Sequence, residues 1–189
     1  MSALTSSRAA SVFLRPLEES DIGERYLGWF RDPEVTRFLE ARNIEREDAL
    51  GHLRDGRTSG RWHMYAICRS NDDRHIGNLK IGPIHPRHRT SDLVTVIGER
   101  DAWGKGLARE AIGLGIRLAF DKHGVRKLSA SIDALNAGSL RAYTSAGFVI
   151  EATLPDQFMN IANDEAMLSD KVYVACFNPD FQPVGPAKA

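Results

Sequence analysis

The chain has 189 residues, of which 25 are basic and 25 acidic, so its formal net charge at pH 7 is zero. This length favours one domain with a sizeable core, and the balanced charge excludes a global field that would draw the chain to nucleic acid or to a membrane. Its two cysteines are too few for a disulfide framework, and no run approaches the ~20 apolar residues of a membrane span. We expect a soluble, cytoplasmic protein with a single domain over residues 1–189, a core of about 11–178 and mobile ends at 1–10 and 179–189.

The N-terminal part of the chain predicts a short strand at residues 12–14 and then a helix. We expect Asp21 to cap this helix, with Glu24 three residues later completing a capping box, and Asp32-Pro33 to end it. Four apolar residues share one face of the helix and predict its buried side: Ile22, Tyr26, Leu27 and Phe30.

A second helix and a hairpin follow. Residues 45–54 have weaker helical periodicity, and Gly56 stands just beyond the expected end of that helix. Residues 61–68 alternate as a strand does, residues 71–74 have the composition of a turn, and residues 75–82 read as the partner strand.

The apolar run LVTVIG, residues 93–98, predicts a strand buried on both faces. From Gly106 to about Lys122 apolar residues recur at helical spacing, and Gly124 stands where a left-handed residue would end the helix. The apolar face of this helix consists of Leu107, Ala111, Leu114, Leu118 and Ala119.

The remaining sequence predicts a strand at 126–133, a helix from Asn136 that stops at Gly147, and strands at 148–152 and 171–177. Because strands and helices mix throughout, we expect an α/β (α+β) domain around one central mixed sheet of about seven strands, flanked by about four helices.

The segment RDAWGKGLAREA, residues 100–111, places two glycines at the start of the long helix, where free backbone N–H groups and the helix dipole favour an anion. A nucleotide-triphosphate loop is excluded, because Gly98 is one residue too far from Gly104-Lys105 and Gly106 supplies no hydroxyl for magnesium. A dinucleotide fingerprint is excluded as well, because Arg109 stands where its third glycine would be. The turn therefore either binds another anion or uses glycine for purely backbone reasons.

A second motif lies about thirty residues further on, where Asn136, Ser139, Tyr143 and Gly147-Phe148 have the spacing N-x-x-S-x-x-x-Y-x-x-x-G-F. Together with the glycine turn, this segment resembles the GNAT superfamily of acetyl-CoA-dependent N-acyltransferases, in the branch that contains the ribosomal-protein N-terminal acetyltransferases. The resemblance covers nearly the whole chain, from VFLRPLEESD to KVYVACF.

The resemblance implies that the sheet splays between its fourth and fifth strands and that acetyl-CoA binds there. The exposed edge of residues 93–98, including Ile97, would pair with the pantetheine arm. The pyrophosphate would lie on the backbone N–H groups of the glycine turn, with Lys105 as an added charge, and Asn136 and Ser139 would reach the cofactor. The full set of turn residues is Trp103, Gly104, Lys105, Gly106, Leu107 and Ala108. Asp101 stands where the family has Gln or Arg, so we expect its carboxylate to point away from the phosphates.

The resemblance also suggests catalytic residues, each with a structural alternative. Tyr143 is either the acid that protonates the departing thiolate or a packed aromatic residue. Glu99 is the first candidate for the base that deprotonates the amine, and otherwise a carboxylate near the cofactor loop. Glu40 is the second candidate and would alternatively bind the substrate cation. Histidines and acids show no metal-ligand spacing, so no metal is expected.

The acceptor is left open between a small-molecule amine, such as an amino-sugar nucleotide, and a protein N-terminus, either of which would attack directly in a ternary complex. The alternative from another class is a catalytically inactive module that binds acyl-CoA as a sensor or assembly part. Neither nucleic acid nor a membrane is an expected partner, and a homodimer is left open.

Overall fold

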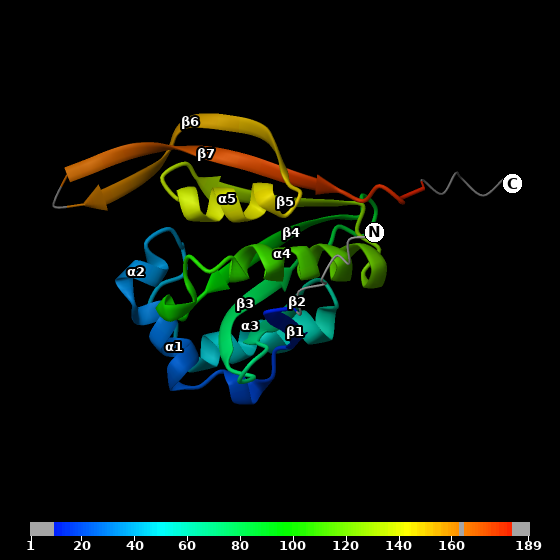
Figure 1. Cartoon of the computed structure of the whole chain (residues 1–189), viewed down its shortest axis with the longest axis horizontal. Coiled ribbons are helices and arrows are strands. Elements are labelled where there is room, and N and C mark those ends of the chain that lie inside the picture. Colours follow the sequence, from blue (N-terminus) through cyan, green and yellow to red (C-terminus); the bar gives the residue numbers. More distant parts are fainter. Residues whose placement is uncertain (1–9, 163–164, 183–189) are drawn as a thin grey trace, which may run out of the picture.

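The computed structural model describes residues 10–162 and 165–182, and these form a seven-stranded mixed sheet flanked by helices (Figure 1). The order of the strands in the sheet is β1-β2-β3-β4-β5-β7-β6. The strands are β1 (Val12–Pro16), β2 (His63–Arg69), β3 (His75–Ile81), β4 (Thr90–Ile97), β5 (Lys127–Asp133), β6 (Val149–Ala162) and β7 (Glu165–Phe177). The helices are α1 (Glu24–Arg31), α2 (Pro33–Thr36), α3 (Arg46–Ser59), α4 (Leu107–Arg117) and α5 (Ala137–Ser145). The predicted fold class and number of strands are confirmed.

The sheet opens between β4 and β5, as expected. These strands are parallel neighbours, but only residues 90–92 pair with residues 127–129. Beyond Asp92 the two strands separate (Figure 1). The edge of β4 from Leu93 to Ile97 is therefore left without a strand partner on that side.

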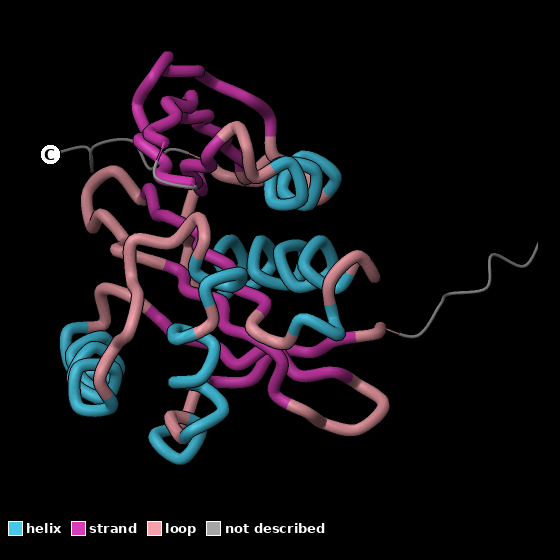
Figure 2. Tube along the Cα trace, turned by 90° about the vertical axis from the view of Figure 1, so that its left-hand side faces the viewer, coloured by secondary structure: helices cyan, strands magenta, loops and turns pink. Residues whose placement is uncertain are grey.

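Helices cover the two faces of the sheet and form two core clusters (Figure 2). On β2, Tyr65 and Ile67 point toward the cluster that includes α4 and α5, while Ala66 and Cys68 point toward α1 and α3. The second cluster contains no buried residue of β4. Val94 is accordingly 42% exposed and residues 95–97 are only partly buried, so the prediction that residues 93–98 are buried on both faces is wrong.

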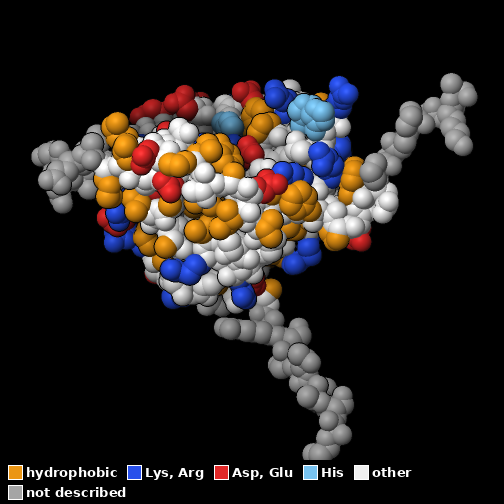
Figure 3. Space-filling view, turned by 90° about the horizontal axis from the view of Figure 1, so that it is seen from above, with side chains coloured by type: hydrophobic (Ala, Val, Ile, Leu, Met, Phe, Trp, Pro, Cys, Tyr) orange, Lys and Arg blue, Asp and Glu red, His pale blue; other side chains and the backbone are white. Residues whose placement is uncertain are grey.

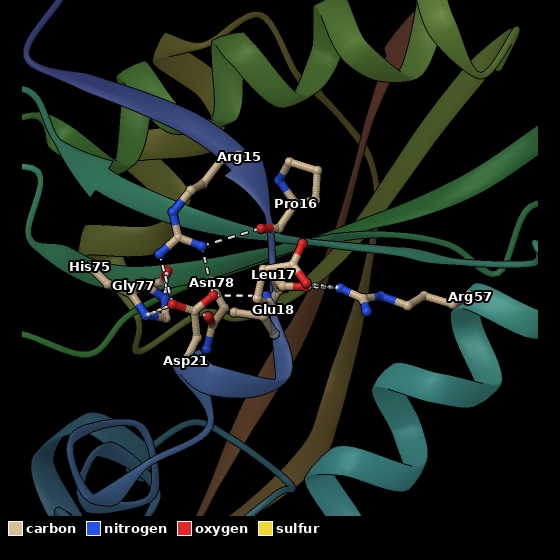
Figure 4. Close-up of polar contacts among 9 residues, drawn as sticks. All are labelled: Arg15, Pro16, Leu17, Glu18, Asp21, Arg57, His75, Gly77 and Asn78. Atoms are coloured by element: carbon tan, nitrogen blue, oxygen red, sulfur yellow. Dashed lines mark hydrogen bonds and ion pairs between the residues drawn. The ribbon is translucent and has the colours of Figure 1, made fainter.

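Helix α1 begins after Gly23 and not after Asp21, which corrects the predicted cap. Asp21 ends a short 3-10 turn, Glu19–Asp21, where its carboxylate accepts a hydrogen bond from the amide of Glu18 (2.7 Å). The same carboxylate pairs with both terminal nitrogens of Arg15, at 2.6 and 2.7 Å (Figure 4). The predicted capping box of Asp21 and Glu24 is therefore wrong, and Asp21 instead forms a capping box with Glu18 in this turn. The predicted inward face of α1 is buried, as expected.

Helix α3 continues through Gly56 to Ser59, beyond the predicted end at residue 54. Gly56 does not end the helix but lets it pack closely, because a Cβ at this position would lie 2.4 Å from the indole nitrogen of Trp62. The residue in the left-handed conformation is Gly60, with φ of 63°. Helix α4 ends as predicted, through a π-helical turn at Leu118–Lys122 and then Gly124 with φ of 60°.

The C-terminal hairpin is longer than predicted, since β6 and β7 span 14 and 13 residues. Only Lys171–Phe177 of β7 pairs with β5, so the outer half of the hairpin has no strand beyond it. Its register shifts between Leu154 and Phe158, around Pro155. Large apolar side chains on the hairpin are exposed, for example Met159 at 68%, and hydrophobic and charged groups alternate over the face seen from above (Figure 3). Because few residues in the outer half of the hairpin are buried, the sequence of this segment lacks the alternation of apolar and polar residues that predicts a strand.

The predicted mobile ends, 1–10 and 179–189, lie largely outside the described residues. Within the described residues no helix is both long and apolar enough to cross a membrane.

Candidate functional site

A cleft of about 610 Å³ lies where the sheet opens. One wall comes from β4 and from the start of α4 with its preceding loop, and another from α5 with its cap, Asn136. Residues 34–39, in and after α2, form the remaining wall. The topology thus brings both sequence motifs to a single cavity.

The glycine loop at the start of α4 is shaped to accept an anion. Gly104 and Gly106 have φ of 72° and 78°, and a Cβ added at either would meet no atom within 4 Å. Within the described part of the chain, no hydrogen bond uses the backbone N–H groups of residues 104–109. These donors lie at the positive end of the α4 dipole and beside open space, so the loop fits a phosphate group.

Two residues of the predicted phosphate loop act differently from the prediction. The backbone N–H of Trp103 donates to the carbonyl of Arg100 (3.1 Å) and is not free for a ligand, because Trp103 follows a short 3-10 turn. Lys105 is exposed and is not among the residues that line the cleft. Of the six residues predicted to offer amides to a phosphate, Trp103 is therefore removed, and the other five stay a prediction.

Asp101, the acidic departure from the family pattern, is held away from the cleft. Its carboxylate lies 3.3 Å from the guanidinium of Arg69 on β2, which also binds Asp72 at 2.6 Å. Asp101 does not line the cleft. Its charge is therefore partly neutralised on the outside of the loop, as the sequence suggested.

Side chains bind two carbonyls on the open edge of β4. The hydroxyl of Tyr143 donates to the carbonyl of Leu93 (2.8 Å), and the indole N–H of Trp103 donates to the carbonyl of Ile97 (2.9 Å). Thr95 stands between them and lines the cleft together with Ile97. These two bonds satisfy the carbonyls of Leu93 and Ile97 in place of a strand partner. Among the described residues, the edge of β4 between them, around Thr95, has no such bond.

Tyr143 is buried at the base of the cleft, with 4% of its surface exposed. Its ring meets that of Phe148 edge-on, with centroids 5.0 Å apart. Burial raises the pKa of Tyr143 to about 12, and contacts with Thr95 offset part of that rise. The phenol consequently keeps its proton at any physiological pH. Asn136 caps α5 by accepting a hydrogen bond from the amide of Ser139 (3.1 Å), and both residues line the cleft.

The two candidate carboxylates, Glu99 and Glu40, are not among the residues that line the cleft. Glu99 accepts a hydrogen bond from the indole of Trp29 (3.0 Å) and pairs with Arg74. Trp29 also packs edge-on against His75, which belongs to the buried polar network of Arg15, Asp21 and Asn78 (Figure 4). Glu40 is exposed in the loop after α2.

Four charged residues of the cleft were missed from the sequence: Glu34, Arg37, Arg109 and Arg141. Arg109 and Arg141 lie inside the two recognised motifs, so their positions near helix starts gave a usable signal. Glu34 and Arg37 gave none, because Asp32-Pro33 was interpreted only as the end of α1. Pro33 also occupies the first position of α2, where a missing N–H costs nothing.

Comparisons with known proteins agree with this geometry. A family model described as the acetyltransferase (GNAT) domain matches residues 11–149. The chain is 25% identical over 144 residues to the uncharacterized N-acetyltransferase p20 of Bacillus licheniformis. This match covers 74% of this chain and 79% of that protein. It is 27% identical over 161 residues to spermidine N(1)-acetyltransferase of Escherichia coli strain K12. This match covers 79% of this chain and 79% of that protein.

Solved structures share the fold at lower identity. Spermidine N-acetyltransferase from Vibrio cholerae, in complex with CoA and spermine, has a TM-score of 0.77 at 17% identity and covers 88% of this chain and 95% of its own. Ribosomal-protein-S5-alanine acetyltransferase from Vibrio fischeri has a TM-score of 0.76 at 17% identity. The match covers 92% of this chain and 96% of that chain. Among the described residues, no group of three or more His, Cys, Asp or Glu side chains could hold a metal ion.

Proposed function

The chain belongs to the acetyltransferase (GNAT) family, and we propose that it transfers the acetyl group of acetyl-CoA to a primary amine. The observation that carries this proposal is the loop of residues 104–109, which has free N–H groups and, Lys105 apart, lines the same cleft as Tyr143. Acyl transfer from a thioester that carries phosphate groups needs an anion-binding site and a proton donor in the same cavity. The glycine loop and Tyr143 would supply these two. Acetyl-CoA, when bound, supplies the activated acetyl group.

The residues that would hold acetyl-CoA come from both motifs. The N–H groups from Gly104 to Arg109 would bind its pyrophosphate, each charge-assisted bond contributing ~1.5–3 kcal/mol. Arg109 on α4 and Arg141 on α5 line two walls of the same cleft and would add positive charge for the phosphates. The open edge of β4 around Thr95 would pair with the amides of the pantetheine arm.

Tyr143 would donate a proton to the departing sulfur. Its pKa of about 12 lies well above the reference value of a thiol, about 8.5. A complete transfer to a free thiolate would therefore be unfavourable, so the phenol would act by hydrogen bonding as charge develops on sulfur. To do so its hydroxyl must leave, or share its proton with, the carbonyl of Leu93.

The proton of the attacking ammonium would leave through water. Glu99 was the first candidate for this role, but its carboxylate binds Arg74 and Trp29. Glu40 is exposed outside the cleft. We propose that solvent in the cleft relays the amine proton and that Glu99 acts by holding Trp29 of α1 against the end of β4.

A thermal-shift titration tests the cofactor assignment. Acetyl-CoA should stabilise the fold by about 2.7 kcal/mol at a hundred times its Kd, whereas ATP and NAD should not. A shift with ATP or NAD and none with acetyl-CoA would contradict the proposal.

A further inference from the structure

One wall of the cleft is left for the acceptor once β4, α4 and α5 are assigned to acetyl-CoA, as proposed above. Residues 34–39 form this wall, and their only charged members are Glu34 and Arg37. Val35, Phe38 and Leu39 supply the apolar remainder. Among the described residues that line the whole cleft, Glu34 is the single carboxylate.

Glu34 lines the cleft and has no basic partner within the described ranges, whereas three carboxylates that do not line the cleft are paired. Asp32 lies 3.8 Å from Arg100, Asp101 lies 3.3 Å from Arg69, and Glu99 pairs with Arg74. No ion pair within 4.0 Å involves Glu34 in the described part of the chain. An exposed, unpaired carboxylate that lines the cleft is suited to receive a ligand ammonium.

Arg37 is likewise free of acidic partners among the described residues. Its guanidinium lies over the ring of Phe38, 5.1 Å from the centroid, which restrains it at the cleft wall. Glu34 and Arg37 are three residues apart, a spacing at which ion pairs form on helices, yet their charged atoms are not within 4.0 Å. Both charges therefore remain available to a ligand.

We propose that Glu34 and Arg37 select an acceptor that carries one primary amine and, a few atoms away, a carboxylate or phosphate. This inference rests on the proposed acetyl transfer and narrows its substrate class. A polyamine would bring two or more ammonium groups against a single carboxylate and beside an unpaired guanidinium. Each like-charge contact of this kind would oppose binding. The spermidine specificity named for some relatives is thus not expected here.

Matched amine pairs test this selection. The probes are glucosamine 6-phosphate against glucosamine, phenylalanine against phenylalanine amide, and spermidine as the polyamine. Release of CoA is followed for the wild type, Glu34→Gln, Arg37→Gln and Glu40→Gln, the last being an exposed glutamate outside the cleft. Binding of acetyl-CoA is measured separately for every variant.

For at least one pair, we expect the anionic member to have a kcat/KM about 10- to 100-fold above its neutral counterpart. Arg37→Gln should remove this preference, because kcat/KM for the anionic member falls while that for the neutral amine rises modestly with the loss of a like charge near its ammonium. Glu34→Gln should raise KM for both members about 10-fold, and Glu40→Gln should behave as wild type.

Two results would overturn the inference. If spermidine or the neutral amines are the best substrates and Arg37→Gln does not change the ratios, the selection is wrong while acetyl transfer stands. If acetyl-CoA binds but none of the probes is acetylated, both the selection and the proposed transfer lose their support.

Discussion

Replacing Tyr143 by Phe separates the catalytic and structural roles of the phenol, and the structure predicts that the change affects both. The hydroxyl donates to the carbonyl of Leu93 on the open edge of β4, in a buried setting. Its removal leaves that carbonyl unpaired, which should cost about 1–3 kcal/mol of unfolding free energy. The ring and its contact with Phe148 remain, so the fold should persist.

The same substitution removes the proposed acid. We expect kcat to fall about 10²–10⁴-fold, equivalent to ~2.7–5.4 kcal/mol in the barrier, with little change in the Kd for acetyl-CoA. Because the pKa of Tyr143 lies near 12, the wild-type rate should show no loss from ionisation of this group below about pH 10.

Tyr65→Phe is the matched control. Its hydroxyl is also bonded in the interior, 2.8 Å from Nε2 of His123, but Tyr65 does not line the cleft. This variant should lose stability to a similar extent and keep kcat. The assays are urea unfolding, acetyl-CoA binding and steady-state release of CoA, with a burst experiment to show that chemistry limits the wild-type rate. If Tyr143→Phe stays within about threefold of wild type in kcat, the general-acid assignment is refuted.

Three further changes test other parts of the account. Gly104→Val should cost only about 1–2 kcal/mol of stability, because its φ is left-handed but its surroundings are open, while weakening acetyl-CoA binding more than tenfold in a calorimetric titration; equal losses would favour a purely structural turn. Glu99→Gln should lower the melting temperature, because Arg74 loses its partner, and change kcat less than about fivefold if water is the proton relay; a loss above a hundredfold would restore Glu99 as the base. Burial, with the charges of His63 and Lys122, lowers the pKa of His123 to about 4, so the folded state resists a proton that the unfolded chain accepts below about pH 6.5. Stability is therefore lost as pH falls from about 6.5 toward 4, and urea unfolding at pH 7 and 5 should show a smaller loss for His123→Gln than for wild type; an identical loss would exclude this histidine as a source.

The fold was predictable from the sequence where one face of an element is buried against the core. The apolar periodicity of α1 and α4 predicted their buried faces, and Gly124 and Gly147 were found with positive φ at helix ends. The hairpin β6–β7 was predicted only where β7 pairs with β5, because its outer half buries few side chains. Gly56 was misread because a glycine required for close packing against Trp62 looks the same in sequence as one that ends a helix.

The candidate site was predictable where local motifs define it. The glycine loop, Asn136 and Tyr143 meet in one cleft because β4, α4, β5 and α5 follow one another in the chain. The wall of the cleft formed by residues 34–39 was not predictable from the sequence. These residues reach the cleft only through the packing of α2, which is far from both motifs in the chain. The ion pair of Glu99 was not predictable for a related reason, because its partner Arg74 lies on another segment of the chain.

Transfer of an isotope-labelled acetyl group tests the central claim most directly. The protein is incubated with labelled acetyl-CoA and the amine panel, and the products are identified by mass spectrometry alongside the release of CoA. The account predicts label on the nitrogen of an amine in equal amount to the CoA released, with the rate reduced at least a hundredfold in Tyr143→Phe. CoA release without a labelled amine, or tight binding of acetyl-CoA with no release on any amine, would contradict it.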